Sequence, residues 1–345
     1  MKLNNLLRGV CVEKILIIPA IILLFIISAA VFLIVKTSQV NSGREEVDRI
    51  LGMTAYPEFV NGGSIRKLSI LPLVDFYSDS NSIKVEPGVS YLIKADNKTI
   101  LLDTGYNSEG THPSALLQNM KVLNINISDI DMIFITHLHP DHLGGMDEMK
   151  HGEFSLSRGT VELGRIPVYS PGPVKPSRWN PGPEVHVIHD PTIIAPGIFS
   201  LGVIPRHLFL MGRTDEQVLA LNLKGKGIAL IVGCGHPTVE RIIQRAKMVF
   251  HEPIYAIIGG LHFPVHGGRG NIGPVNIQYI VGADRAPWHG LTEQDVNNSI
   301  RAIEKEKVSV VSLSPHDSSD WSLEQFRKAF PKSWIDLKAG KEINL

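Results

Sequence analysis

The stretch Ile135-Thr-His-Leu-His-Pro-Asp-His-Leu-Gly-Gly145 is the most specific pattern in this chain. It follows an apolar run typical of a buried strand and contains four potential metal ligands: His137, His139, Asp141 and His142. Imidazole and carboxylate groups suit zinc, iron and manganese, and the spacing lets two imidazoles project the same way from an extended segment. Pro140 turns the chain, so the last two ligands approach from a second direction, which favours a pair of metals.

A purely structural role for these histidines is a poor alternative. Several core histidines satisfied by the backbone would bury too many unpaired polar rings beside an apolar strand. The stretch is therefore interpreted as a metal site.

The signature HxHxDH resembles that of the metallo-β-lactamase superfamily. Further blocks extend the resemblance: Glu86-Pro-Gly-Val-Ser-Tyr-Leu-Ile, Ile100-Leu-Leu-Asp-Thr-Gly105, Ile231-Val-Gly-Cys-Gly-His-Pro237, Ile257-Ile-Gly-Gly-Leu-His-Phe263 and Ser312-Leu-Ser-Pro-His316. The last three are similar to the branch of dihydropterin ribofuranosyl-aminobenzene phosphate synthases. The resemblance implies an α/β fold, a four-layer αββα sandwich with two metals at one edge of the stacked sheets.

By this resemblance, the first metal has the ligands His137, His139 and His236, and the second has Asp141, His142 and His316. Zinc is expected, with iron or manganese as alternatives. Asp103 matches the family's strand-end aspartate, which supports the metal histidines. Cys234 stands where much of the superfamily has a bridging aspartate, and both a thiolate ligand and a buried small residue stay open for it.

Two residues are candidates for catalytic roles beside the metals, Asp141 and His262. His262 follows a strand and a glycine pair, so it is a possible ligand, a group that binds a substrate anion, or a histidine that only flanks a loop. Asp317-Ser318-Ser319 follows His316 where the branch has Cys-Thr-Gly, so the branch's substrate is not carried over. Three further histidines, His207, His266 and His289, are expected on loops and facing solvent.

Residues 15–35 form an uncharged apolar stretch, which as a helix would measure about 31 Å and would span a bilayer. A cleaved signal peptide is the alternative, but its apolar part is normally about 7–15 residues. Basic residues precede the stretch, whereas the basic residues that follow it are accompanied by acidic residues. The N-terminus is therefore expected in the cytoplasm and the bulk of the chain outside. The expected parts are a cytoplasmic segment 1–14, an anchor 15–35, a polar tether 36–64 and one domain 65–345.

Alternating patterns predict the elements of the domain. Strands are expected at 68–74, 90–95, 99–102, 132–136, 217–223, 227–232, 254–258 and 308–313, with helices at 113–123, 237–250 and 293–305. The Pro-rich segment 167–196 and the Gly-rich segment 263–290 are expected to be long loops that shape a binding site, or tolerated insertions.

The composition excludes some classes of function. The chain has 345 residues, with 34 Lys+Arg against 34 Asp+Glu, so nothing in its charge favours a nucleic-acid partner. Two cysteines exclude a disulfide-stapled scaffold. The phosphate loop, the serine nucleophile elbow and the dinucleotide fingerprint have no match in the sequence.

The favoured function is a membrane-anchored metal-dependent hydrolase, which acts on an ester, amide, lactone or phosphodiester bond of a small molecule with a metal-activated water. A pterin-related synthase or transferase and a metal-dependent binding module are the alternatives. A closed set of four ligands, typical of structural zinc, does not describe the predicted site.

Overall fold

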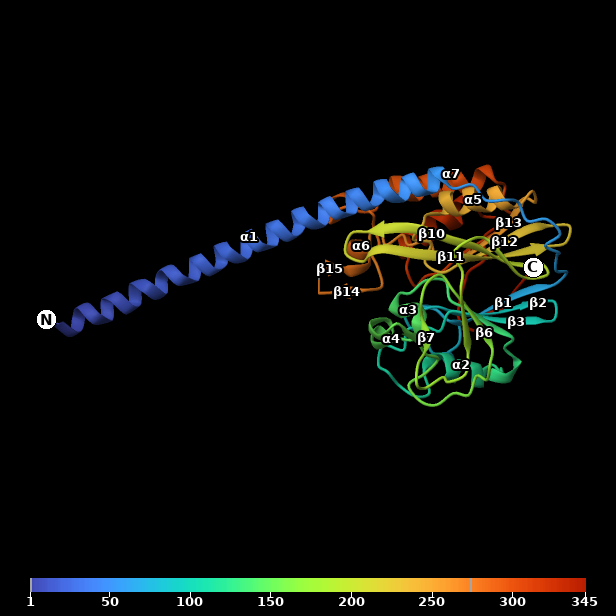
Figure 1. Cartoon of the computed structure of the whole chain (residues 1–345), viewed down its shortest axis with the longest axis horizontal. Helices are drawn as coiled ribbons and strands as arrows, with labels where there is room; N and C mark the ends of the chain where they lie inside the picture. Colours follow the sequence, from blue (N-terminus) through green and yellow to red (C-terminus); the bar gives the residue numbers. More distant parts are fainter. Residues whose placement is uncertain (1, 274) are drawn as a thin grey trace.

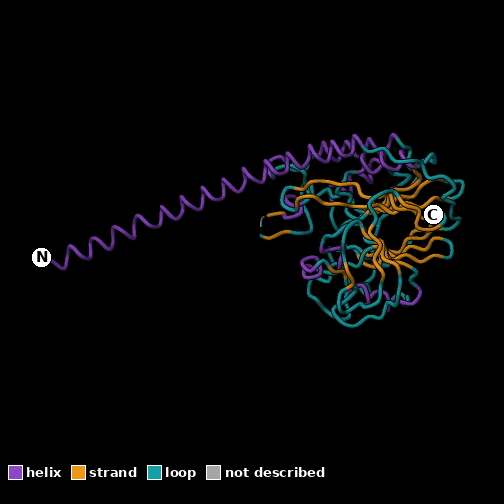
Figure 2. Tube along the Cα trace, viewed as in Figure 1, coloured by secondary structure: helices purple, strands orange, loops and turns teal. Residues whose placement is uncertain are grey.

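The structure is a computed structural model that describes residues 2–273 and 275–345. A long helix, α1 (Lys2–Met53), leads into a domain in which two sheets face each other (Figures 1 and 2). Between residues 19 and 53, this helix contains a stretch that is apolar and long enough to cross a membrane. A signal sequence near an N-terminus would pass the same test.

The first sheet, in the part of the chain that the structure describes, has seven strands in the order β17-β1-β2-β3-β4-β6-β8. Their bounds are β1 (Leu68–Val74), β2 (Ser90–Ala95), β3 (Lys98–Leu102), β4 (Met132–Phe134), β6 (Pro167–Ser170), β8 (Glu184–Val187) and β17 (Ile343–Asn344). β1, β2 and β3 pair antiparallel, whereas β3, β4, β6 and β8 run parallel.

The second sheet has six strands within the described residues, in the order β16-β13-β12-β11-β10-β9. They are β9 (Thr192–Ala195), β10 (Ile198–Leu208), β11 (Gly212–Leu223), β12 (Gly227–Val232), β13 (Ile254–Gly259) and β16 (Val310–Leu313). β12, β13 and β16 are parallel, and β11 is antiparallel to β12. Two short ladders complete the strands: β5 (Glu153–Phe154) with β7 (Lys175–Pro176), and β14 (Asn271–Ile272) with β15 (Val275–Asn276).

Helices cover the outer faces of both sheets. The elements after β3 are α2 (Ala115–Val122), η1 (Ile127–Asp129), α3 (Pro140–Leu143) and α4 (Met146–His151), and those after β12 are α5 (Val239–Val249), α6 (Ile277–Val281), η2 (Pro287–His289), α7 (Glu293–Lys305) and α8 (Asp320–Ala329). α7 buries Val296, Ile300 and Ile303 at helical spacing, and the side chains of Thr292 and Asp295 cap its first turn.

Three apolar clusters separate the four layers. The cluster between the sheets joins side chains such as Ile93 and Phe134 of the first sheet to Leu219 and Ile258 of the second. A second cluster lies under α2, and a third lies under α5, α7 and α8. The predicted αββα sandwich is thus confirmed, and the boundaries proposed for its domain stay a prediction.

Two expectations were wrong. The segment 167–196 is not a long loop, because it contains β6, β7, β8 and β9; short strands near a sheet edge carry too few residues for a periodic pattern. The segment 36–64 is not a tether throughout, because α1 continues to Met53 and buries Val40 and Val47 against the domain. The segment 263–290 is loop-rich, with short elements β14, β15, α6 and η2.

Candidate metal centre

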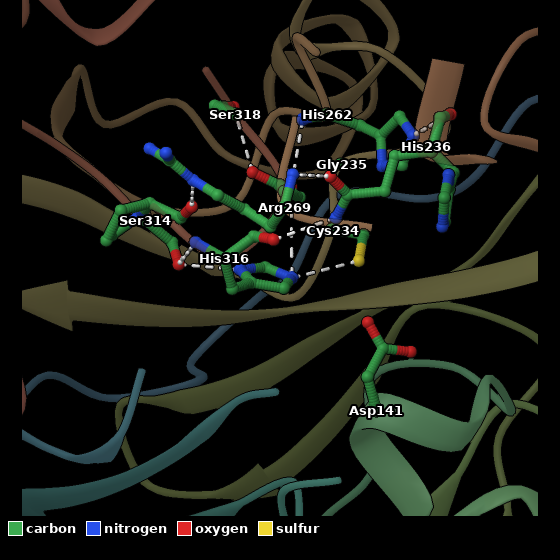
Figure 3. A network of polar contacts seen from close by, with 12 residues as sticks. Asp141, Cys234, Gly235, His236, His262, Arg269, Ser314, His316 and Ser318 are labelled. Carbon is green, nitrogen blue, oxygen red and sulfur yellow. Dashed lines mark hydrogen bonds and ion pairs between the residues drawn. The ribbon is translucent and has the colours of Figure 1, made fainter. Parts of the chain in front are cut away.

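The candidate ligands come from the carboxyl ends of parallel strands. Asp103 follows β3, His137 follows β4, His236 follows β12, His262 follows β13 and His316 follows β16. Parallel strands end at the same edge of a sheet, and the two sheets lie face to face, so residues from distant parts of the chain meet there. Figure 3 shows five of the residues of this edge, Asp141, Cys234, His236, His262 and His316, with part of their hydrogen-bond network.

The signature segment changes from extended to helical conformation between its ligands. His139 is extended, with φ −86° and ψ 158°, and Pro140 starts the one-turn helix α3 that carries Asp141 and His142. Gly144 ends this turn with φ +90°, and a Cβ there would lie 2.0 Å from the carbonyl oxygen of Ser155. Glycine is therefore required for the turn that presents the second pair of ligands.

One group of ligand atoms belongs to His137, His139 and His236, all within 4.8 Å of one another. His236 Nε2 lies 3.2 Å from His139 Nδ1. Among the described residues, His137 Nε2 and His236 Nδ1 are buried and have no hydrogen-bond partner. Buried polar atoms of this kind are expected where an ion completes the site, so the group fits a divalent metal.

A second group contains Asp141, His142, Cys234 and His316, again within 4.8 Å. The Cys234 sulfur lies 3.1 Å from His142 Nε2 and 3.2 Å from His316 Nε2, and Asp141 Oδ2 lies 3.6 Å from His142 Nε2. Cys234 is a buried free thiol between the histidines. The structure thus places the thiol beside the predicted ligands of the second metal.

Asp103 orients this second group. It is fully buried with φ +57°, a left-handed conformation that aims its carboxylate at three partners. The backbone N–H and the hydroxyl of Thr136 donate to it, each at 2.7 Å, and His142 Nδ1 lies 2.7 Å from Oδ2. The contact fixes the ring of His142 with Nε2 toward the cluster.

His316 is held by a relay that the sequence did not predict. Ser314 Oγ lies 2.6 Å from His316 Nδ1 and donates to Asp75 Oδ2 at 2.7 Å. Tyr91 donates to the same carboxylate oxygen at 2.8 Å. Burial raises the pKa of Asp75 to about 6. The signal for this role in the sequence was an acidic residue, Asp75, directly after the predicted strand 68–74.

Glu216 shapes the loop that carries Cys234 and His236, and it was also missed. Its buried carboxylate on β11 accepts the backbone N–H groups of Cys234 at 3.1 Å, Gly235 at 2.9 Å and His236 at 2.9 Å. Burial raises the pKa of Glu216 to about 7. Glu216 directly precedes the predicted strand 217–223, so the sequence offered only a charged residue next to a strand. Which side chains of β11 are buried depends on the packing of the sheet to which it belongs.

Burial keeps most imidazoles of the cluster neutral. It lowers the pKa of His139 to about 4 and holds the pKa values of His137, His236 and His316 well below the ordinary value. For His142, burial also lowers the pKa, but Cys234 and Asp103 outweigh this and raise it. Neutral rings are the form that binds metals, and a divalent cation would compete with the proton on His142.

His262 is buried and faces the cluster, so it does not merely flank a loop. It has φ +53°, its N–H donates to Asp317 at 2.9 Å, and its Nε2 lies 3.1 Å from the carbonyl oxygen of Gln278. Within the described part of the chain, its Nδ1 is buried without a partner. Its ligand atom also lies within 4.8 Å of those of Cys234 and His236.

A cavity of about 300 Å³ opens beside the cluster. Its polar floor is formed by His139, Asp141, Cys234, His236 and His262. Its apolar wall is formed by Met146, Met149, Met211, Ile277 and Val281.

The other predicted histidines lie elsewhere. His207 is not on a loop: it lies on β10 and is half-buried beside α1, close to Gly43. His266 and His289 are exposed as expected, and His266 lies 2.7 Å from Glu293.

The chain is similar to several known proteins. Residues 83–209 match the family model described as the metallo-beta-lactamase superfamily. A 7,8-dihydropterin-6-methyl-4-(beta-D-ribofuranosyl)-aminobenzene-5'-phosphate synthase of Methanocaldococcus jannaschii is 29% identical over 241 residues, 59% of this chain and 80% of that protein. A protein of Bacillus subtilis named a probable metallo-hydrolase is 37% identical over 59 residues, 17% of this chain and 18% of that protein.

Among solved structures, a metal-dependent hydrolase of the beta-lactamase superfamily is similar, with a TM-score of 0.54 and 20% identity over 81% of this chain and 99% of that one. At this identity the likeness concerns the fold alone.

Proposed function

Because the chain carries a metallo-beta-lactamase superfamily domain, we propose that it is a membrane-anchored, dinuclear metal-dependent hydrolase of small molecules. One observation carries the proposal: two adjacent groups of His, Asp and Cys side chains converge at one edge of the sandwich, with buried nitrogen atoms of His137 and His236 unpaired among the described residues. Zinc is the preferred metal, with iron or manganese as alternatives.

His137, His139 and His236 would hold one metal, and Asp141, His142, His316 and Cys234 the other. Divalent metals supply Lewis acidity, which lowers the pKa of water toward neutrality and polarises the bond that is attacked. The chain itself orients the ligands through Asp103, Ser314 and Glu216. Asp141 and His262 face the cavity, where they would position a polar group of the substrate or carry a proton.

The test is metal analysis together with activity. The purified full chain should contain close to two equivalents of divalent metal and hydrolyse a generic ester or phosphodiester, and His139→Ala should lose both metal and most turnover. His289→Ala, which changes an exposed histidine, is the matched control. Full activity of His139→Ala without metal would refute the proposal.

A pterin-related synthase is the second candidate, favoured by the 29% identity to the Methanocaldococcus jannaschii protein. Location separates the two, because the basic residues before the apolar stretch favour a domain outside the cytoplasm, whereas pterin-related substrates are made inside. A topology reporter fused after Leu345 checks this, and a cytoplasmic signal would favour the synthase.

A further inference from the structure

The domain holds α1 directly after the apolar stretch of this helix. Large apolar side chains from Ile21 to Val35 are exposed, whereas Val40 is fully buried together with Phe209 and Ala286. Val40 lies five residues after Val35 along the helix, a rise of about 7.5 Å. If the apolar stretch spans a bilayer, the surface around Phe209 lies about one to two helical turns from the membrane.

Several elements that line the cavity lie on this same side of the domain. Figure 1 shows the β10–β11 turn, α3, α4, α6 and the β14–β15 ladder on the side of the domain toward the N-terminal end of α1. Met146, Met211 and Ile277, which line the cavity, come from α4, this turn and α6. The candidate site therefore lies on the side of the domain toward the expected membrane surface.

Exposed apolar side chains line this cavity or lie on the elements next to its lining, and we call Met146, Leu210, Met211 and Trp288 the apolar rim. They are 42%, 38%, 38% and 56% exposed. Met146 and Met211 line the cavity, Leu210 precedes Met211 in the turn, and the Trp288 ring lies 6.4 Å from that of Phe209. Single exposed apolar residues are ordinary, but several around one opening mark an interaction surface.

We propose that the apolar rim rests in the bilayer interface and that the cavity takes an amphiphilic substrate directly from the membrane. The apolar chain would lie along the methionine wall, and the bond to be hydrolysed would lie at the polar floor. Tryptophan prefers the membrane interface, and methionine adapts to varied apolar chains. The inference rests on the proposed function, because it needs both the anchor and the hydrolytic site.

Depth measurement tests the docking without any activity. The full chain is placed in phosphatidylcholine vesicles with brominated acyl chains, which quench tryptophan in the interface. Of the four tryptophans, Trp288 should account for most of the quenching, so Trp288→Phe should remove most of it and Trp179→Phe should leave it unchanged. Equal quenching of both variants, or no quenching of the inserted protein, would overturn the docking. A rim covered by a second copy of the chain instead of by lipid would give such a result.

Two substrate probes test the substrate class. In the same vesicles, a long-chain 4-nitrophenyl alkyl phosphate should be turned over faster than soluble bis(4-nitrophenyl) phosphate. Leu210→Glu should slow the membrane probe about tenfold, because one buried leucine is lost from the interface, and should leave the soluble probe unchanged. Val122→Glu, on the exposed face of α2, is the matched control.

The outcomes separate the two proposals. Equal turnover of both probes, with Leu210→Glu without effect, would overturn the substrate class. No turnover of either probe by the metal-loaded protein, with Trp288 still quenched, would overturn phosphodiester hydrolysis at this site and leave the docking.

Discussion

Asp103 is the residue on which the orientation of His142 depends. Its fully buried carboxylate accepts hydrogen bonds from the backbone N–H and the hydroxyl of Thr136. Its Oδ2 lies 2.7 Å from His142 Nδ1. An asparagine amide in its place would direct N–H groups toward these hydrogen-bond donors, with which they cannot pair. Such supporting contacts typically contribute a factor of 10–100 to metal affinity.

We therefore expect Asp103→Asn to weaken binding of the second metal by about 10–100-fold, with a matching loss of activity. The measurement is metal content after titration with a chelator of known affinity. Asp147→Asn, which changes a surface carboxylate paired with Arg158, is the control. Unchanged retention of metal would show that Asp103 does not support the centre.

Arg206 and Asp284 form a buried ion pair behind His236. Their atoms lie 2.8 Å apart, and Arg206 also donates to the carbonyl oxygen of His236 at 3.1 Å. Burial alone would raise the pKa of Asp284, but Arg206 outweighs it and lowers this pKa below 3.8. The pair thus stabilises the fold above the unfolded-state pKa, and this stability is lost as pH falls through the lower folded-state value.

Two outcomes follow for the pair in chelator-treated protein. Asp284→Ala should lower the free energy of unfolding at pH 7 by about 3–5 kcal/mol, because it leaves the Arg206 cation buried and unpaired. Below about pH 4, the wild-type protein should lose stability more steeply than the variant. Denaturant unfolding across pH measures both, and parallel pH curves would contradict the assignment.

At the scale of elements, α1 shows how docking extends a helix into a polar sequence. Residues 36–53 are polar and include glycine, which is typical of a tether, yet Val40 and Val47 lie seven residues apart on one helix face. Gly43 lies between them against His207, where a Cβ would come within 2.0 Å of the ring. The surface of β10 thus selects the helical conformation.

Gly43→Leu should release this segment from the domain. A larger side chain must displace the His207 ring, so the residues after Val35 should become sensitive to protease in the full chain. Ser42→Leu, which changes an exposed neighbour, should remain resistant. The readout is the rate of limited proteolysis, and equal rates for the two variants would show that the docking tolerates the substitution.

The strands within 167–196 also depend on their place in the tertiary structure. β6 and β8 belong to the first sheet although prolines surround them, because they lie toward its edge and their pattern is short. By contrast, β1, β2, β12 and α7 match their predicted residues closely, since a buried strand needs a long apolar run and α7 has a complete apolar face.

At the scale of the whole molecule, the site joins the two sheets. Ligands from the first sheet's edge meet His236 and His316 from the second, so a bound metal would hold both halves together. Binding to the native state alone stabilises by mass action, about 2.7 kcal/mol at a free metal concentration 100 times the dissociation constant.

Removal of metal should therefore lower the melting temperature of the full chain, and added zinc should restore it. Differential scanning calorimetry before and after chelation measures the shift. His139→Ala should show little shift on chelation, and an equally large one would locate the metal elsewhere.

The sequence alone indicated the resemblance to the metallo-beta-lactamase superfamily, predicted eight of the thirteen strands described in the two large sheets, and suggested the residues of the candidate cluster. It could do so because the signature and the strand-end histidines are local patterns with specific chemistry. Only the tertiary structure decided which groups hold those ligands, as Glu216 and Asp75 do, and how α1 meets the domain. Those contacts depend on which face of each strand the opposite sheet covers and on which surface a helix finds to bury its valines. Neither is a property of any single segment.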